Sequence, residues 1–165
     1  MVVTGYLGTM LLGTIAYRSQ QDVQDTIRSI LKEAMIHQNP PFQLGRTLAE
    51  ARVASACMDI SDGLSGAVHA MCSASRVGAT IDESLIPIKP ELIALADKLG
   101  FGRLPLSLAG GDWQFLYAIP RENIGRAMDI ASELGGCLSI IGEFQHDPSR
   151  ILAKTLDGDL RRFLR

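Results

Sequence analysis

The first forty residues combine short apolar runs with turn residues. The apolar residues 1–3 predict a strand that runs into a glycine-containing turn, and the apolar positions of residues 10–16 predict a short helix. A second helix is expected over residues 21–37, where apolar side chains recur every three or four positions. Ser19 or Asp22 is available to cap its start.

The clearest break in the pattern is Asn39-Pro40-Pro41. Two prolines end a helix and push the preceding residue into extended geometry. We therefore expect an N-terminal arm over residues 1–40 and a main body over residues 41–165, within one domain.

The main body alternates between patterns typical of helices and of strands. Strands are expected at residues 56–60, 77–81, 114–119, 137–141 and 151–156. Helices are expected at residues 47–54, 64–72, 90–99 and 121–134. Strands that alternate with helices predict an α/β (or α+β) fold, a layered sheet with flanking helices.

The composition restricts the possible partners. The 165 residues carry 16 basic and 18 acidic side chains with no basic block, so a nucleic-acid partner is not expected. The most apolar stretch, residues 6–17, is too short to span a bilayer and contains glycine and threonine, so no membrane segment is expected. Because the N-terminus also lacks the pattern of a signal peptide, we expect a cytoplasmic protein.

Cysteine and histidine give no indication of a site. The three cysteines have no Cys-x-x-Cys spacing, which favours reduced, mostly buried thiols over a disulfide framework or a zinc site. The three histidines lie far apart in the sequence, and ordinary surface or core positions are expected for them.

The segment Asp59-Ile60-Ser61-Asp62-Gly63 places two carboxylates and a hydroxyl between a predicted strand and a predicted helix. A helix N-terminus favours an anion, but the two aspartates would repel a phosphate brought there alone. A magnesium ion would remove this conflict, because it binds carboxylate and phosphate oxygens together. The alternative is that Asp62 only caps the helix and Asp59 is solvated.

Residues 59–64 are similar to the motif that opens the C-terminal half of the thiamine-monophosphate kinases, members of the aminoimidazole ribonucleotide synthetase superfamily. Five further segments resemble this family's pattern in the same order. They are residues 3–8, 77–81, 85–88, 109–117 and 140–143. Together they cover nearly the whole chain.

The resemblance implies a magnesium and ATP site. Asp59 and Asp62 would bind Mg²⁺, and Ser61 would touch the nucleotide. The resemblance also implies an ATP-dependent, magnesium-requiring phosphotransferase that converts thiamine monophosphate to thiamine diphosphate. Two alternatives are a paralogue that uses ATP to activate a different substrate, and a non-catalytic domain for ligand binding or assembly.

The resemblance further implies a substrate loop. Its residues would be Gly110, Gly111, Asp112 and Trp113. The chain departs from the family where Gly111 and Gln114 stand at positions of glutamates, which changes the hydrogen bonds available to a cationic substrate. Asp112 and Trp113 supply an acid and an aromatic face for a flat cationic ring. Trp113 is equally compatible with a core or interface position.

The family's N-terminal half, which carries most of its ATP and metal aspartates, has no counterpart in residues 1–165. We therefore expect a single C-terminal-type domain that is inactive alone. Its expected partners are an N-terminal ATP-binding domain, in cis or as a separate chain, a small-molecule phosphate acceptor and further copies of itself in a homo-oligomer.

Overall fold

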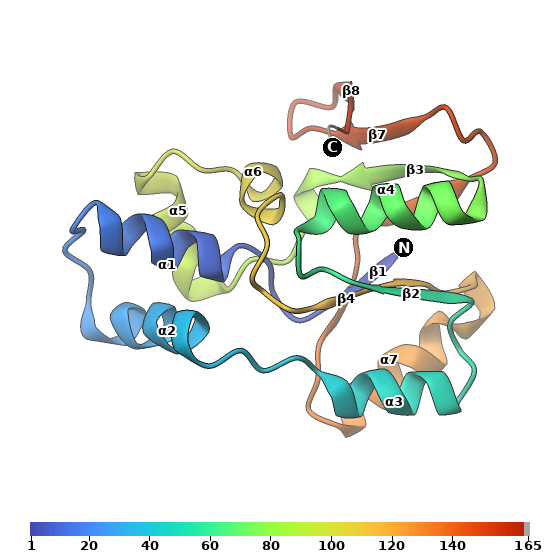
Figure 1. Cartoon of the computed structure of the whole chain (residues 1–165), viewed down its shortest axis with the longest axis horizontal. Coiled ribbons are helices and arrows are strands. Elements are labelled where there is room, and N and C mark those ends of the chain that lie inside the picture. Colours follow the sequence, from blue (N-terminus) through green and yellow to red (C-terminus); the bar gives the residue numbers. More distant parts are fainter. Residues whose placement is uncertain (164–165) are drawn as a thin grey trace.

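Two four-stranded sheets form the framework of this computed structural model, which describes residues 1–163. The first sheet has the order β2-β4-β1-β5, and the second has the order β6-β3-β7-β8 (Figure 1). The strands of the first sheet are β1 (Val2–Thr4), β2 (Ala56–Asp59), β4 (Phe115–Ala118) and β5 (Leu138–Ile140). Those of the second are β3 (Gly78–Asp82), β6 (Gly142–Gln145), β7 (Ile151–Lys154) and β8 (Leu160–Arg162).

Helices cover the sheets on several sides. They are α1 (Thr9–Arg18), α2 (Asp25–Ile36), α3 (Phe42–Glu50), α4 (Leu64–Ser75), α5 (Ile93–Lys98), α6 (Arg103–Ser107) and α7 (Ile124–Glu133). Three short 3₁₀ turns, η1 (Glu83–Leu85), η2 (Pro90–Leu92) and η3 (Arg121–Asn123), lie between them. In Figure 1, α1 and α2 lie together at one end, and α3 and α7 lie side by side against the first sheet.

The first sheet separates two apolar cores. Successive residues of a strand point to opposite faces, so Val2 and Tyr117 belong to the core shared with α3 and α7, while Val3 and Leu116 belong to the larger core. That larger core also contains α4 residues such as Val68 and residues of the second sheet. Helix α4 is therefore packed between the two sheets.

The shortest of the chain's connections between the two sheets is the step from β5 to β6. Strands β5 and β6 are separated only by Ile141, whose backbone N–H donates to the Met1 carbonyl (3.1 Å) and whose carbonyl accepts from the Asp82 N–H (2.9 Å). The chain therefore changes its pairing partner within one residue. Strand β5 pairs with β1 of the first sheet, and β6 pairs with β3 of the second. This link fixes the orientation of one sheet relative to the other.

The predicted fold class is confirmed: the chain has a mixed architecture of sheets and flanking helices. The strand of residues 1–3 is also confirmed, and as β1 it pairs with both β4 and β5. This part of the predicted arm therefore lies inside the first sheet.

Two helix predictions were wrong in their bounds. The helix expected at residues 47–54 is α3, which begins directly after Pro41 and has already ended at Ala51. Gly45 is tolerated inside it because the helix approaches the rings of Phe115 and Tyr117 there. The helix expected from residue 21 begins only at Asp25, and neither predicted cap is used.

Several short elements escaped prediction because their patterns are weak. Helix α6 has only five residues and includes Pro105. Strand β8 is exposed along its whole length, so it lacks the alternation of a half-buried strand. Helix α6 packs against α1 and η1, and β8 pairs with β7. The local sequence of neither element predicts its structure.

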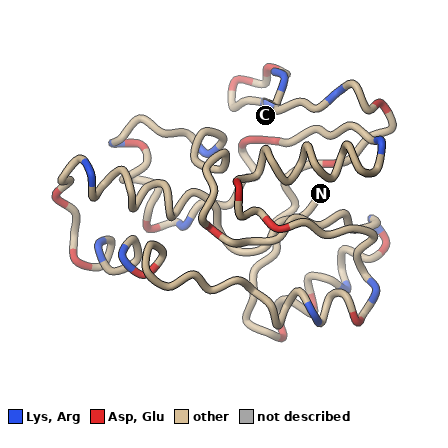
Figure 2. Tube along the Cα trace, viewed as in Figure 1, with Lys and Arg blue, Asp and Glu red and all other residues tan. Residues whose placement is uncertain are grey.

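Charged residues of both signs are interspersed along the chain (Figure 2). This distribution agrees with the absence of a basic block in the sequence. Separately, no helix within residues 1–163 is long and apolar enough to cross a membrane.

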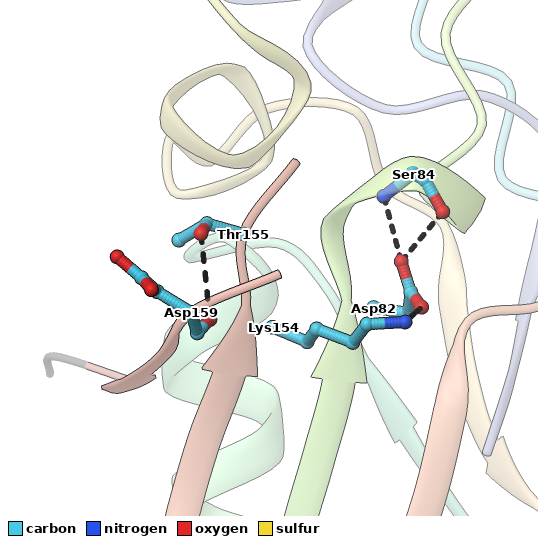
Figure 3. Close-up of polar contacts among 5 residues, drawn as sticks. All are labelled: Asp82, Ser84, Lys154, Thr155 and Asp159. Carbon is cyan, nitrogen blue, oxygen red and sulfur yellow. Dashed lines mark hydrogen bonds and ion pairs between the residues drawn. The ribbon is translucent and has the colours of Figure 1, made fainter. Parts of the chain in front are cut away.

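Asp82 joins the ends of β3 and β7 (Figure 3). One carboxylate oxygen accepts from the Ser84 N–H (3.0 Å) and hydroxyl (2.6 Å), and the other accepts from the Lys154 ammonium (3.0 Å). These bonds, first those from Ser84, hold the pKa of Asp82 below its ordinary value. The ionised form therefore stabilises the end of the parallel strand pair.

We predict that Asp82→Ala lowers the free energy of unfolding at pH 7 by about 1 kcal/mol. Because the folded-state pKa is lowered, this contribution is fully present above about pH 4 and is lost as the pH falls through the folded pKa. Urea titrations between pH 7 and pH 2 measure it. Asp157→Ala, an exposed turn position, serves as the control and should change little. A difference between wild type and Asp82→Ala that persists at the acid end would contradict the prediction.

Candidate functional site

The first element of the site is the turn after β2, which carries Asp59, Ser61 and Asp62. Asp59 is the last residue of an edge strand, and its side chain and that of Asp62 are exposed. The Ser61 hydroxyl donates to Asp59 Oδ2, and this bond is the main cause that lowers the pKa of Asp59. The turn therefore presents an ionised carboxylate to solvent at neutral pH.

Gly63 ends this turn and begins α4. Its φ of 91° lies in a region that side chains rarely adopt, and a Cβ built on it would lie 2.1 Å from the Leu108 carbonyl oxygen. Glycine is therefore required by both the backbone conformation and the close approach. As a result, the turn packs directly against the segment that follows α6.

That segment carries the predicted substrate loop. A Cβ on Gly110 would lie 2.2 Å from the Ser61 carbonyl oxygen, and the Gly111 N–H donates to the same oxygen (2.9 Å). On the other side of the turn, the Ile60 N–H donates to the Gln114 carbonyl (2.7 Å). The two loops are therefore held together by their backbones, and neither can move alone.

Trp113 projects from this loop in an uncommon conformation. Its φ is 53°, in the left-handed region, and 39% of the residue is exposed. Backbone conformations of this kind cost free energy and are concentrated at functional sites. This exposure argues against a position in the core, whereas the predicted aromatic face and an interface position both stay open.

Asp112 points away from solvent toward the start of α1. Oδ2 accepts from the Gly8 N–H (2.6 Å), and Oδ1 accepts from the Met10 N–H (3.1 Å). Burial raises the pKa of Asp112, while the amide hydrogen bonds act in the opposite direction. Its carboxylate satisfies the free amides of a helix N-terminus and thereby fastens α1 to the loop.

Gln114 is fixed in a similar way. Its Oε1 accepts from the Thr4 hydroxyl (2.8 Å), and its Nε2 donates to the Asp112 carbonyl (3.1 Å). Thr4 is fully buried, and its hydroxyl oxygen accepts from the Phe115 N–H (2.9 Å). The side chain that stands in place of a glutamate therefore connects β1 with β4.

A cleft of about 590 Å³ lies beside these groups. Its lining residues come from the turn after β1, from α2 and its C-terminal extension, from the residue before η2 and from the substrate loop. They include Gly5, Tyr6, Thr9, Ser29, Ile30, Glu33, Ala34, His37, Lys89, Gly111, Asp112 and Gln114. This volume is in the range of small-molecule sites.

The acidic turn fits magnesium in chemistry but does not complete a site. Exposed carboxylates such as those of Asp59 and Asp62 are the hard oxygen ligands that Mg²⁺ prefers. Within residues 1–163, however, no group of three or more His, Cys, Asp or Glu side chains is placed to hold a metal ion. Asp59 and Asp62 would therefore share an ion with phosphate oxygens, water or a second polypeptide segment.

With this geometry established, comparison with protein families is informative. The model for the C-terminal domain of AIR synthase related proteins matches residues 33–153. The chain belongs to this family. The match includes the acidic turn and the substrate loop, and the two sheets with flanking helices are the fold of its structural neighbours.

Among curated relatives of this AIR synthase related domain, the thiamine-monophosphate kinase of Halobacterium salinarum is 29% identical over 166 residues. This alignment covers 96% of the chain and 49% of the relative. A putative hydrogenase expression/formation protein of Methanocaldococcus jannaschii is 29% identical over 161 residues, covering 96% of the chain and 45% of the relative. The chain thus spans about half the length of these relatives.

Solved structures show the same fold. The thiamine-monophosphate kinase from Stenotrophomonas maltophilia has a TM-score of 0.80 at 21% identity, covering 97% of this chain and 50% of that one. The structure described as AaThiL complexed with AMPPCP and TMP has a TM-score of 0.74 at 23% identity, covering 96% and 47%.

The structure separates the predicted site residues into two groups. Gly111 and Asp112 line the cleft, whereas the other five do not: Asp59, Ser61, Asp62, Gly110 and Trp113. The α2 side of the cleft, including Glu33 and His37, was not predicted as part of a site, because a helix face gives no signal of what it will face. Lys89 was not predicted as part of a site either. It directly precedes η2, and its ammonium lies over the Tyr6 ring.

We predict that Asp112→Ala lowers the free energy of unfolding by about 1–2 kcal/mol, because two α1 amides lose their acceptor. Asp25→Ala is the matched control. Asp25 also lies in the first turn of a helix, but it is exposed and has only a 3.7 Å contact with Arg28. Chemical denaturation of both variants tests this, and equal effects would show that Asp112 does not anchor α1.

We also predict that Gly110→Ala forces the two loops apart, because its Cβ would meet backbone atoms that cannot rotate away. The expected loss is about 1–3 kcal/mol of unfolding free energy. Gly125→Ala in α7 has open space around its Cβ and should be neutral or stabilising. Thermal unfolding compares the two, and the contact between the loops is disproved if Gly110→Ala is as stable as Gly125→Ala.

Proposed function

We propose that this chain is the C-terminal domain of an ATP-dependent, magnesium-requiring phosphotransferase of the thiamine-monophosphate kinase type. The observation that carries the proposal is the acidic turn, in which the Ser61 hydroxyl lowers the pKa of Asp59 and the backbone of a glycine-rich loop holds the turn in place. Its occurrence in this family, together with thiamine-monophosphate kinases among the relatives, supports this reading.

Asp59 and Asp62 would bind the Mg²⁺ that accompanies the nucleotide phosphates. Magnesium, when bound, neutralises the charge of the nucleotide phosphates and so favours phosphoryl transfer. Ser61 holds the Asp59 carboxylate in one orientation and contacts the nucleotide. The exposed ring of Trp113 offers a flat surface to a planar group beside the turn.

The adjoining cleft receives the phosphate acceptor. Gly111, Asp112 and Gln114 line it, and the backbone bond from Gly111 to Ser61 keeps a fixed distance between cleft and acidic turn. Such fixed positioning is the main contribution a protein makes to phosphoryl transfer. No covalent intermediate on the protein is needed.

A second half of the protein completes this site. Within residues 1–163 no third His, Cys, Asp or Glu joins Asp59 and Asp62 in a metal-binding group, and the chain spans only about half of its curated relatives. We propose that an N-terminal ATP-binding domain, in cis or as a separate chain, supplies the missing ligands. Residues 1–165 then act as one domain of a two-domain enzyme.

One observation favours a second candidate. The hydrogenase expression/formation protein is as similar to the chain as the first kinase, at 29% identity, and Gly111 and Gln114 depart from the kinase pattern. A paralogue that uses ATP on a different acceptor retains the acidic turn and changes the cleft. ADP release measured with a panel of acceptors separates the two candidates.

We predict that the double substitution Asp59→Asn, Asp62→Asn lowers ADP release with magnesium-ATP and thiamine monophosphate by at least about a hundredfold. The assay uses the two-domain protein, or this chain mixed with its N-terminal counterpart. Asp129→Asn, an exposed position on α7, controls for the loss of charge and should keep full activity. Turnover by the double variant at the wild-type rate would refute the proposed role of the acidic turn.

A further inference from the structure

The hydroxyl of Thr9 is buried without a hydrogen-bond partner. Thr9 is the first residue of α1, and only 4% of it is exposed. Within residues 1–163 its Oγ1 is the only buried side-chain nitrogen or oxygen atom that makes no hydrogen bond. Nearly all buried polar atoms of proteins are hydrogen-bonded, because a buried hydroxyl without a partner destabilises the fold. The position of Thr9 therefore has to be explained by something other than stability.

The start of α1 offers this hydroxyl no partner of its own. Thr14, in the same helix, donates to the Met10 carbonyl one turn back (3.0 Å). Thr9 begins the helix, so no helical turn precedes it to supply such a carbonyl. The free amides of the first turn do not serve either, because those of Gly8 and Met10 donate to the Asp112 carboxylate. The local structure thus leaves the Thr9 hydroxyl available.

Thr9 also lines the cleft. It shares this lining with Tyr6 of the preceding turn and with Gly111 and Gln114 of the substrate loop. The cleft volume of about 590 Å³ accepts a small organic molecule. A buried hydroxyl without a partner and a cleft of ligand size therefore meet at one residue.

From this coincidence we infer that Thr9 is a specificity-determining residue, whose hydroxyl hydrogen-bonds a neutral polar group of the molecule held in the cleft. A threonine hydroxyl donates one bond and accepts up to two, so a hydroxyl, carbonyl or amide group of the ligand fits it. A neutral group reaches a buried oxygen without the cost of removing a charge from water. The inference rests on the proposed function only in taking the cleft as the acceptor site, and it adds a residue that selects the acceptor.

The expected bond contributes to selectivity and not to the stability of the free protein. Without ligand, the hydroxyl has lost its hydration and gained no bond, so it destabilises the fold. A ligand with a matching polar group supplies the bond, whereas an analogue without that group leaves the hydroxyl unpaired and binds more weakly. A residue that only supports the fold behaves in the opposite way, because its removal destabilises the free protein.

Thermal unfolding without ligand tests the first part of the inference. Thr9→Val replaces the hydroxyl by a methyl group of similar size and should raise Tm by about 2–4 °C. Thr14→Val is the matched control. It makes the same change in the same helix outside the cleft, and it should not raise Tm because a hydrogen bond is lost. A Tm of Thr9→Val equal to or below that of wild type would overturn the inference.

Titrations followed by NMR chemical shifts test the contact with a ligand. The probes are thiamine monophosphate and benzamide, which carries a ring and a neutral amide. We expect Thr9→Val to weaken the binding of at least one probe about tenfold, and Thr9→Ser, which keeps the hydroxyl, to retain most of the affinity. Thr14→Val should bind both probes like wild type. Equal affinities of Thr9→Val and Thr14→Val for both probes, or no binding of either probe to wild type, would disprove the role of Thr9.

The inference and the proposed function fail in different ways. In the two-domain protein with magnesium-ATP, Thr9→Val should raise KM for the acceptor and leave kcat nearly unchanged, because the bond is present in the bound substrate as well as in the transition state. Probe binding that depends on Thr9, in a protein without phosphotransfer, refutes the function and keeps the inference. Phosphotransfer whose KM is the same in Thr9→Val and wild type refutes the inference and keeps the function.

Discussion

The backbone contact between two turns is the constraint on which the rest of the site depends. The carbonyl of Ser61 accepts from Gly111, the N–H of Ile60 donates to Gln114, and glycines at 63 and 110 leave no room for a side chain between the loops. This contact joins the end of β2 to the start of β4, which are already neighbours in the first sheet. The acidic turn and the substrate loop are therefore one rigid unit, and the position of any ligand at one is set relative to the other.

The same unit extends into the core through carboxylate and amide side chains. Asp112 fastens the start of α1, and Gln114 bonds Thr4 at the end of β1. Burying an ionised carboxylate costs free energy, and the oriented amides at a helix N-terminus offset part of that cost. Asp112 and the aspartates of the acidic turn thus have different environments. Asp59 and Asp62 are exposed to solvent, whereas both carboxylate oxygens of Asp112 accept hydrogen bonds from backbone amides.

Local patterns were sufficient to predict most strands and the local structure around the acidic turn. The strand, turn and helix around Asp59 follow from an apolar run, an Asp-Gly pair and an amphipathic run, and the structure has each of them. The contact between the two loops, about fifty residues apart in the sequence, was not predicted. Residue pattern alone did not indicate it, because a glycine required by a distant carbonyl looks the same in a sequence as a glycine in a flexible turn.

What the sequence did not predict depends on long-range packing. Residues 1–3 read as a strand but gave no partner, and in the structure β1 lies between β4 and β5. Helix α2 lies beside the turn that follows β1. For this reason its polar residues Ser29 and Glu33 line the cleft together with its apolar residues Ile30 and Ala34. Lys89 joins this lining because the Leu7 N–H bonds the Pro87 carbonyl (2.9 Å) and draws the segment before η2 against the turn. This backbone bond joins segments eighty residues apart, so the local sequence around Lys89 gives no sign that this side chain lines a cleft.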